Sequence, residues 1–174
     1  MIESARNRAW QAVNAELAAL QLAFGQNLLQ ETAAFQLVID KEEDLSGLTA
    51  NQIAEAASRA EKAGMAGKWG FGLDNPSVMP FLANADNREL RKQILEAYLN
   101  RGNNGNDQDN NEVIKKLVEL RLKKAQIMGC ENYAEFALGN RMAKTEEAVY
   151  NLLDQIWEPA LKVAKQEAEQ MQQY

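Results

Sequence analysis

Among the residue types that could do chemistry, histidine is absent from this 174-residue sequence. Catalytic zinc sites are mostly built from histidine, and serine–histidine and cysteine–histidine nucleophile pairs require it. Cys130 is the only cysteine, so neither an intrachain disulfide nor a multi-thiolate metal site can form. We interpret Cys130 as a small, half-buried apolar side chain rather than as a reactive thiol. The composition thus argues against most common hydrolytic active sites within these residues.

The segment 101–111 is rich in Asn, Asp and Gly, and its side-chain oxygens are of the kind that bind calcium. A calcium loop of the EF-hand type would place an acidic residue five positions before its glycine. Neither Gly102 nor Gly105 has one there. We therefore predict a turn-rich loop, with a calcium site as the less favoured alternative.

A second cluster is basic and lies in the segment that follows the loop. It consists of Lys115, Lys116, Arg121, Lys123 and Lys124. It could bind phosphate, but glutamates such as Glu112 and Glu119 favour a solvated helix face with local partners. The net charge of −6 and the pI of about 4.9 argue against a nucleic-acid partner without a strong local basic patch.

The third candidate region alternates large apolar residues with glycine. Trp69 and Phe71 would share one face of a short strand near 68–73, and glycine allows close approach of a ligand to the backbone. Asn75 follows directly. Core packing is the favoured role for these three residues, and we assign no catalytic, cofactor-binding or metal-binding residue in the chain. The sequence shows no second strand to pair with this one.

The elements that would position these residues are helical. Apolar residues from Trp10 to Leu28 recur at steps of three and four, which predicts one long helix, and the stripe resumes at Phe35 and Val38. An acidic linker over 41–47 follows. Further helix starts are predicted at Thr49 with Gln52 in a capping box, Asn75 with Pro76, Asp86 with Glu89, Asp109 with Glu112, Asn132, and Thr145. Gly64, Gly129 and Gly139 are predicted helix ends, and Pro159 should kink the last helix.

Short motifs along the chain resemble one known family in both order and spacing. They are Asp44–Leu48, Trp69–Ser77, Met79–Leu82, Asn87–Arg91, Ala97–Gly102, Leu120–Ala125, Gly129–Phe136, Arg141–Thr145 and Trp157–Leu161. Each motif is weak by itself, but the set is similar to the thimet oligopeptidase and peptidyl-dipeptidase family of zinc metallopeptidases. The resemblance is strongest to the bacterial dipeptidyl carboxypeptidase branch.

The resemblance implies a mainly α, neurolysin-like helical segment with one short strand near 68–73. Residues 1–174 would form a single helical region, with a possible boundary at 41–48. This region would be the N-terminal, non-catalytic part of a larger hydrolase that releases C-terminal dipeptides from short peptides. The family's zinc site uses a His-Glu-x-x-His helix and a distant glutamate, and a chain without histidine cannot supply that motif. Zinc is thus expected in the parent enzyme and not in this chain, which would wall the substrate channel and be inactive alone.

The alternative is a stand-alone helical interaction module without catalytic activity. The expected partners are the remainder of the parent peptidase, short peptides in that parent, or a second copy bound through exposed apolar surface. A nucleic-acid partner is not expected because of the net negative charge. A membrane is not expected because no apolar run approaches the length needed to span a bilayer. The start of the sequence has no apolar signal-peptide core. A soluble protein is expected, with the cytoplasm favoured and a periplasmic parent as the alternative.

Overall fold

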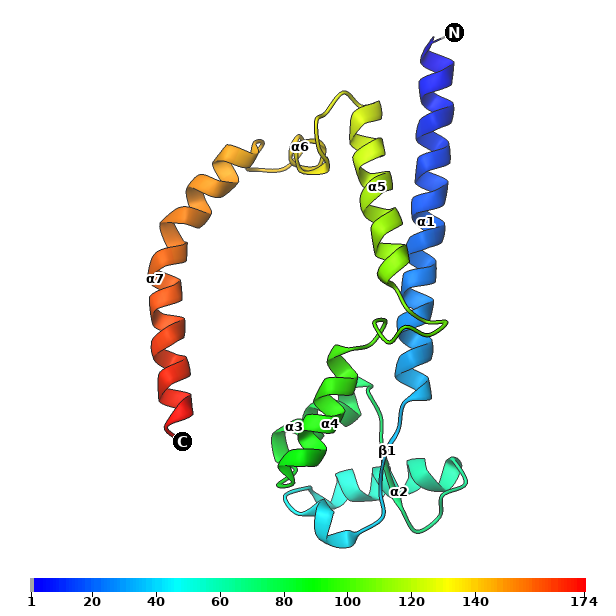
Figure 1. The fold of residues 1–174 in the computed structure, drawn as a ribbon, viewed down its shortest axis with the longest axis vertical. Coiled ribbons are helices and arrows are strands. Elements are labelled where there is room, and N and C mark those ends of the chain that lie inside the picture. The colour runs from blue at the N-terminus through cyan, green and yellow to red at the C-terminus, as the bar shows by residue number, and fades with distance from the viewer. Residues whose placement is uncertain (1) are drawn as a thin grey trace. The chain divides into compact units, whose positions relative to one another are not determined.

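The computed structural model describes residues 2–174, with side chains from residue 4 onward. It is mainly helical, as predicted (Figure 1). The elements are α1 (Ile2–Ala34), β1 (Leu37–Ile39), a 3-10 helix (Glu42–Leu45), α2 (Ala50–Lys62), β2 (Trp69–Phe71), α3 (Asn75–Asn84), α4 (Arg88–Leu99), α5 (Asn111–Ile127), α6 (Tyr133–Leu138) and α7 (Glu146–Gln172). The chain divides into two compact units, one of residues 18–117 and the other of residues 2–17 with 118–174.

The first helix ends earlier than its apolar pattern suggests. The expectation that the helical stripe resumes at Phe35 and Val38 is wrong, because α1 stops at Ala34 and residues 37–39 are extended. Leu37 and Ile39 are buried while Val38 between them is only half-buried, which is the alternation of a strand. A strand of three residues is too short for its period of two to stand out from the helical period before it.

The predicted strand near 68–73 is confirmed as β2, but the expectation that the chain lacks a partner strand is wrong. β1 and β2 pair antiparallel, with Leu37 opposite Phe71 and Ile39 opposite Trp69. The partner was hidden in the residues assigned to the end of the first helix. The two strands form the small sheet of the 18–117 unit.

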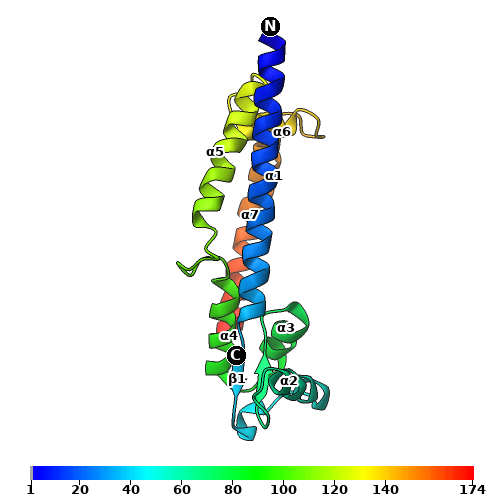
Figure 2. The ribbon, with the colours of Figure 1, turned by 90° about the vertical axis from the view of Figure 1, so that its right-hand side faces the viewer.

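The core of the 18–117 unit lies around this sheet. Figure 1 and Figure 2 both show α2, α3 and α4 gathered around β1. Phe71 of β2 packs against Phe81 of α3 with ring centroids 4.6 Å apart. Val78 and Ile94 are fully buried in the same cluster. The predicted inward face of α4 is confirmed, since Leu90 and Tyr98 pack against this core with Ile94.

Several predicted helix ends are confirmed. Thr49 and Gln52 form the predicted capping box at the start of α2. Gly64, just beyond the end of α2, has a φ of 78°, which a residue with a side chain rarely adopts. Asn132 and Thr145 cap α6 and α7 by accepting from backbone N–H groups of the first turn.

Two predicted N-caps are displaced by one residue. The cap of α3 is Asp74 rather than Asn75, so Asn75 is already helical. The cap of α4 is Asn87 rather than Asp86, and its Oδ1 accepts from the N–H groups of Glu89 and Leu90. Asp86 instead accepts a hydrogen bond of 2.6 Å from Ser46 Oγ, a residue 40 positions away in the sequence. A local pattern carries no information about such a distant partner.

The other unit contains α6, α7 and parts of α1 and α5. Its aromatic contact joins Trp10 of α1 to Phe136 of α6, with centroids 5.9 Å apart. α7 continues through Pro159 as one curved helix (Figure 1). No residue of α7, which the structure describes throughout, is buried, and Trp157 is 63% exposed. Among the described residues, no helix has both the length and the apolar character needed to cross a membrane.

Candidate functional site

Trp69, Phe71 and Asn75, the three candidate residues around the glycine-rich strand, differ in burial and in contacts. Phe71 is buried in the core, which is the favoured role. Trp69 is half-buried and packs against that core. Asn75 is exposed, and its Oδ1 accepts a long hydrogen bond of 3.4 Å from the Tyr98 hydroxyl.

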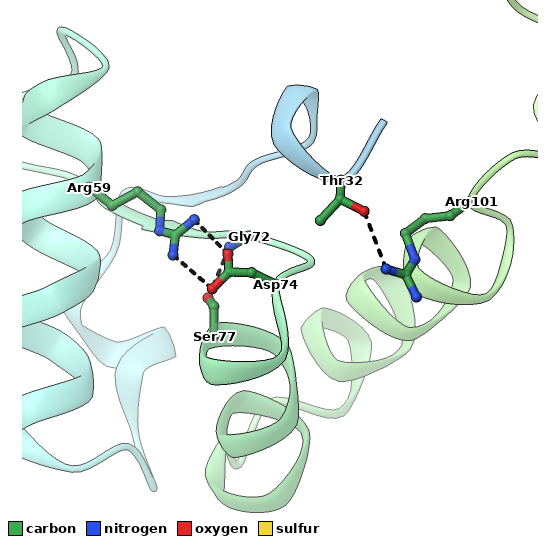
Figure 3. A network of polar contacts seen from close by, with 6 residues as sticks. All are labelled: Thr32, Arg59, Gly72, Asp74, Ser77 and Arg101. Carbon is green, nitrogen blue, oxygen red and sulfur yellow. Dashed lines mark hydrogen bonds and ion pairs between the residues drawn. The ribbon is translucent and has the colours of Figure 1, made fainter. Parts of the chain in front are cut away.

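A fixed ion pair lies beside this strand (Figure 3). Arg59, in the last turn of α2, donates to both carboxylate oxygens of Asp74 at 2.8 and 3.1 Å. A Cβ on Gly72 would lie 2.5 Å from Arg59 Nη1 and 2.7 Å from Asp74 Oδ1. A side chain at position 72 would therefore force the ends of Arg59 and Asp74 to shift. The Gly72 N–H donates to Ser77 Oγ at 3.0 Å, which ties the strand to α3.

This region offers little room for a substrate. The cavity that Arg59, Phe71, Asp74 and Ser77 help to line has a volume of about 40 Å³. That is space for a water molecule or two and not for a peptide. Ser77 also lacks an imidazole base anywhere in the sequence. The arrangement joins α2, β2 and α3 rather than performing catalysis.

The most elaborate polar site of the 18–117 unit surrounds Glu31 near the end of α1, and sequence reasoning missed it. Glu31 is only 9% exposed. Its carboxylate accepts from the Gly102 N–H and from the side-chain amides of Asn104 and Asn106, the latter two at 2.7 Å. Burial raises the pKa of Glu31, but these hydrogen bonds outweigh burial and hold the pKa below its usual value. We call Glu31 with Gly102, Asn104 and Asn106 the Glu31 clamp.

The loop held by the Glu31 clamp is fastened at its far end by Asn110. Asn110 is 2% exposed, and it accepts from Asn27 Nδ2 at 3.0 Å and donates to the Phe24 carbonyl at 3.2 Å. Asp109 accepts from the N–H groups of Asn111 and Gly105, and these bonds keep the pKa of Asp109 low. The predicted turn-rich loop is confirmed, with its amides directed at a buried carboxylate.

Arg101 lies on the wall of a larger cavity beside the Glu31 clamp. Its Nε donates to the Tyr98 carbonyl at 2.9 Å, and its Nη1 donates to Thr32 Oγ1 at 3.2 Å (Figure 3). Its guanidinium carbon lies 3.9 Å above the centre of the Tyr98 ring. The cavity has a volume of about 370 Å³. Its lining is Glu31, Ala34, Phe35, Leu73, Ala97, Arg101, Asn104 and Asn106.

The basic cluster of α5 makes local contacts, and one of them, between Lys115 and Glu112, is of the kind that the favoured interpretation expects. Lys115 Nζ lies 2.5 Å from Glu112 Oε1. Lys124 Nζ donates to Asn14 Oδ1 at 2.7 Å and lies 4.7 Å from the centre of the Trp10 ring. These contacts use two of the cluster's cations to bind neighbouring side chains. Cys130 is half-buried, in keeping with its interpretation as a packing residue.

The side chains of this chain do not fit the zinc centre that the resemblance implies. The sequence has no histidine, and within residues 2–174 no three Asp, Glu or Cys side chains are grouped to hold a metal ion. The Glu31 clamp brings one carboxylate together with N–H donors, which is not a metal donor set.

Comparison with known proteins gives a consistent result across the chain. The family model described as "Peptidase family M3" matches residues 81–174. The probable cytosolic oligopeptidase A of Arabidopsis thaliana is 32% identical over 170 residues, which is 92% of this chain and 24% of that protein. The dipeptidyl carboxypeptidase of Escherichia coli strain K12 is 32% identical over 160 residues, with the same two coverages.

A third relative gives the same proportions. The oligopeptidase A of Haemophilus influenzae is 30% identical over 164 residues, covering 92% of this chain and 24% of its own length. The chain thus spans about a quarter of the length of these relatives.

Proposed function

The chain belongs to peptidase family M3, and from this premise we propose that it is a non-catalytic segment of a zinc peptidase acting on short peptides. The proposal depends on two facts taken together: the share of each relative that this chain matches, and the residue types that the chain lacks. The relatives match 92% of this chain with about a quarter of their own length, and the matched chain contains no histidine. The metal ligands of such a peptidase would therefore lie in other residues of a longer protein.

The zinc ion would supply a polarised water as the nucleophile for peptide hydrolysis. The role proposed for this chain is to form part of the wall of the substrate channel. The Glu31 clamp and the Arg59–Asp74 pair support such a role, because they join segments of the 18–117 unit that are distant in sequence, and their carboxylates are engaged by hydrogen-bond donors. A rigid wall would admit short extended peptides and exclude folded proteins.

The apolar face of α7 supports the proposal that another part of a longer chain packs against it. Leu152, Ile156 and Trp157 are 61%, 53% and 63% exposed. Contiguous exposed apolar area is typical of interaction sites. We propose the remainder of the parent peptidase as that partner, with a second copy of this chain as the alternative when the parent is absent.

For the reaction itself, the release of dipeptides from the C-terminus of short peptides is the activity we favour. The relative named dipeptidyl carboxypeptidase supports it. Proteins named oligopeptidase A match equally well, so cleavage at other positions in short peptides is the second candidate. Mass spectrometry of the products that the longer peptidase forms from an N-terminally blocked peptide separates the two activities. Only the first shortens the peptide from its C-terminus by two residues at each step.

An assay of the purified chain tests the non-catalytic assignment. The chain is incubated with zinc and a hexapeptide blocked at its N-terminus, and the products are followed by mass spectrometry. We expect no cleavage above a buffer control. Cleavage that a chelator abolishes would contradict the assignment.

The gene itself distinguishes a peptidase segment from a stand-alone interaction module. The proposal expects the reading frame to continue beyond the codon for Tyr174 into a segment that encodes a His-Glu-x-x-His helix. A stop codon at that point, together with a stable complex between the chain and an unrelated protein, would favour the module.

A further inference from the structure

The loop held by the Glu31 clamp contains the sequence Asn104-Gly105. We propose that Asn104 is a site of spontaneous deamidation, and that the Glu31 carboxylate suppresses the reaction while the loop is bound to α1. The inference concerns a covalent modification of the chain and is independent of the proposed peptidase role.

The chemistry requires only the chain and water. The Gly105 amide nitrogen attacks Asn104 Cγ, forming a new N–Cγ bond in a five-membered succinimide. The Cγ–Nδ2 bond breaks, and the nitrogen leaves as ammonia with the proton lost from the Gly105 amide. Water then opens the ring at either carbonyl and leaves aspartate or isoaspartate at position 104. No oxidant or other reagent is consumed.

The local structure makes the site reactive once the loop opens. Glycine has no side chain to hinder attack by its own amide nitrogen, and it permits the backbone rotation that the ring needs. Gly105 and Asn104 are both exposed, so water has access. No atom of the described residues outside its chain neighbours lies within 4 Å of a Cβ built on Gly105.

In the closed loop both reacting groups are engaged in hydrogen bonds. Asn104 Nδ2 donates to Glu31 Oε1 at 2.7 Å and to the Asn100 carbonyl at 3.0 Å. These bonds hold the side-chain amide between Glu31 of α1 and the end of α4. The Gly105 N–H donates to Asp109 Oδ2 at 2.8 Å, so the proton that must leave is engaged by a carboxylate with a low pKa. The attack on Cγ needs rotation of the Asn104 side chain, which its two hydrogen bonds oppose.

The product would weaken the Glu31 clamp permanently. A carboxylate at position 104 replaces a donor to Glu31 Oε1 by a second negative charge beside it. Like charges at hydrogen-bond distance repel, so the loop should release from α1. Deamidation would therefore be slow while the loop is closed and would open the loop of each chain that it modifies.

The test is a time course of deamidation at pH 7.4 on the whole chain, followed by peptide mapping and isoaspartate detection. The variants are Glu31→Gln and, as a matched control, Glu16→Gln on an exposed position of the same helix. Loss of hydrogen bonds to a charged group shifts an opening equilibrium by about tenfold or more. We therefore expect modification at Asn104 about tenfold faster in E31Q than in wild type, and unchanged in E16Q.

A second measurement keeps the test decisive if E31Q fails to fold, as judged by circular dichroism. Native wild type is compared with wild type unfolded in urea, and we expect the native chain to be protected by more than about tenfold. Equal rates in folded E31Q and wild type, equal rates in native and unfolded wild type, or modification confined to other asparagines would each overturn the proposal.

Discussion

Individual residues in this chain matter chiefly through contacts with residues far away in sequence. Gly47 is an example from the predicted linker. Its φ is 85°, and a Cβ there would lie 2.0 Å from the Asn84 carbonyl oxygen. Gly64 has a similar φ of 78°, but no atom of the described residues beyond its own neighbours lies within 4 Å of such a Cβ. A comparison of substitutions at Gly47 and Gly64 therefore distinguishes the cost of backbone strain from the cost of a steric collision.

Replacing each of these glycines by alanine should give different losses of stability. G64A should lower the free energy of unfolding by about 1 kcal/mol, since only the left-handed backbone is penalised. G47A should lower it by about 3 to 5 kcal/mol, because the collision with a backbone atom adds to that strain. Urea denaturation measures both. Equal losses would show that Asn84 does not approach Gly47 as described.

The buried carboxylate of Glu31 should make stability depend on pH. The pKa of Glu31 is lower in the folded chain than in the unfolded chain, so its stabilising effect is complete above the unfolded pKa of about 4.3. The effect is lost as pH falls through the folded pKa. E31Q should therefore be less stable than wild type by about 2 kcal/mol at pH 7.

The gap between E31Q and wild type should narrow as pH falls below about 4. Urea denaturation from pH 3 to pH 7 checks this, with E16Q as the control for a solvated carboxylate. A gap that stays constant over this range would contradict the role of the ionised Glu31.

At the scale of elements, the helix ends depend on which residue caps them. Asn87 accepts from two backbone N–H groups at the start of α4, and its Nδ2 also donates to Asp44 Oδ1 at 2.8 Å. Asp86, which the local pattern favours as the cap, makes an exposed hydrogen bond to Ser46 instead. The structure and the sequence pattern thus predict opposite rankings for two neighbouring substitutions.

Alanine at position 87 should destabilise the protein more than alanine at position 86. N87A should cost about 1 to 2 kcal/mol, as for the loss of an N-cap. D86A should cost less than about 1 kcal/mol, because the hydrogen bond that Asp86 accepts from the uncharged Ser46 hydroxyl is exposed to solvent. Thermal unfolding of both variants gives the ranking. A larger loss for D86A would restore Asp86 as the cap.

Elements set by local patterns were predictable from the sequence, and those set by distant contacts were not. The helical class, the capping box at Thr49 and the turn at Gly64 follow from short-range spacing. β1 is too short to show its period, and its identity as a strand depends on pairing with β2, whose paired residues lie 30 to 34 positions later. Glu31 looked like one polar residue on a helix, because its partners lie about 70 positions away.

At the scale of the whole molecule, the described residues include a well-packed core and a long helix with exposed apolar side chains. The core around β1 and β2 is closed, whereas the described residues of α7 include none that is buried. The absence of histidine and the limited coverage of the M3 relatives support the proposal that this segment depends on further residues for catalysis. Substitution on α7 should therefore affect assembly more than the stability of the chain alone.

Replacing Trp157 by lysine tests the role proposed for this face. The variant should leave the urea midpoint of the isolated chain unchanged, because Trp157 is 63% exposed. It should weaken assembly with a longer M3 chain, since a charge would then be buried without a partner. E167Q, a charge-removing change on the same helix, serves as the control. Unchanged assembly in W157K would contradict this use of the face.

A grafted enzyme tests whether this chain serves as a non-catalytic segment of an M3 peptidase. This chain replaces its matching segment in the dipeptidyl carboxypeptidase of Escherichia coli, and the purified chimera is assayed for zinc content and for dipeptides released from a blocked hexapeptide. If the chain is a non-catalytic M3 segment, the chimera binds zinc and releases dipeptides. A folded, zinc-loaded chimera that releases none would contradict the claim.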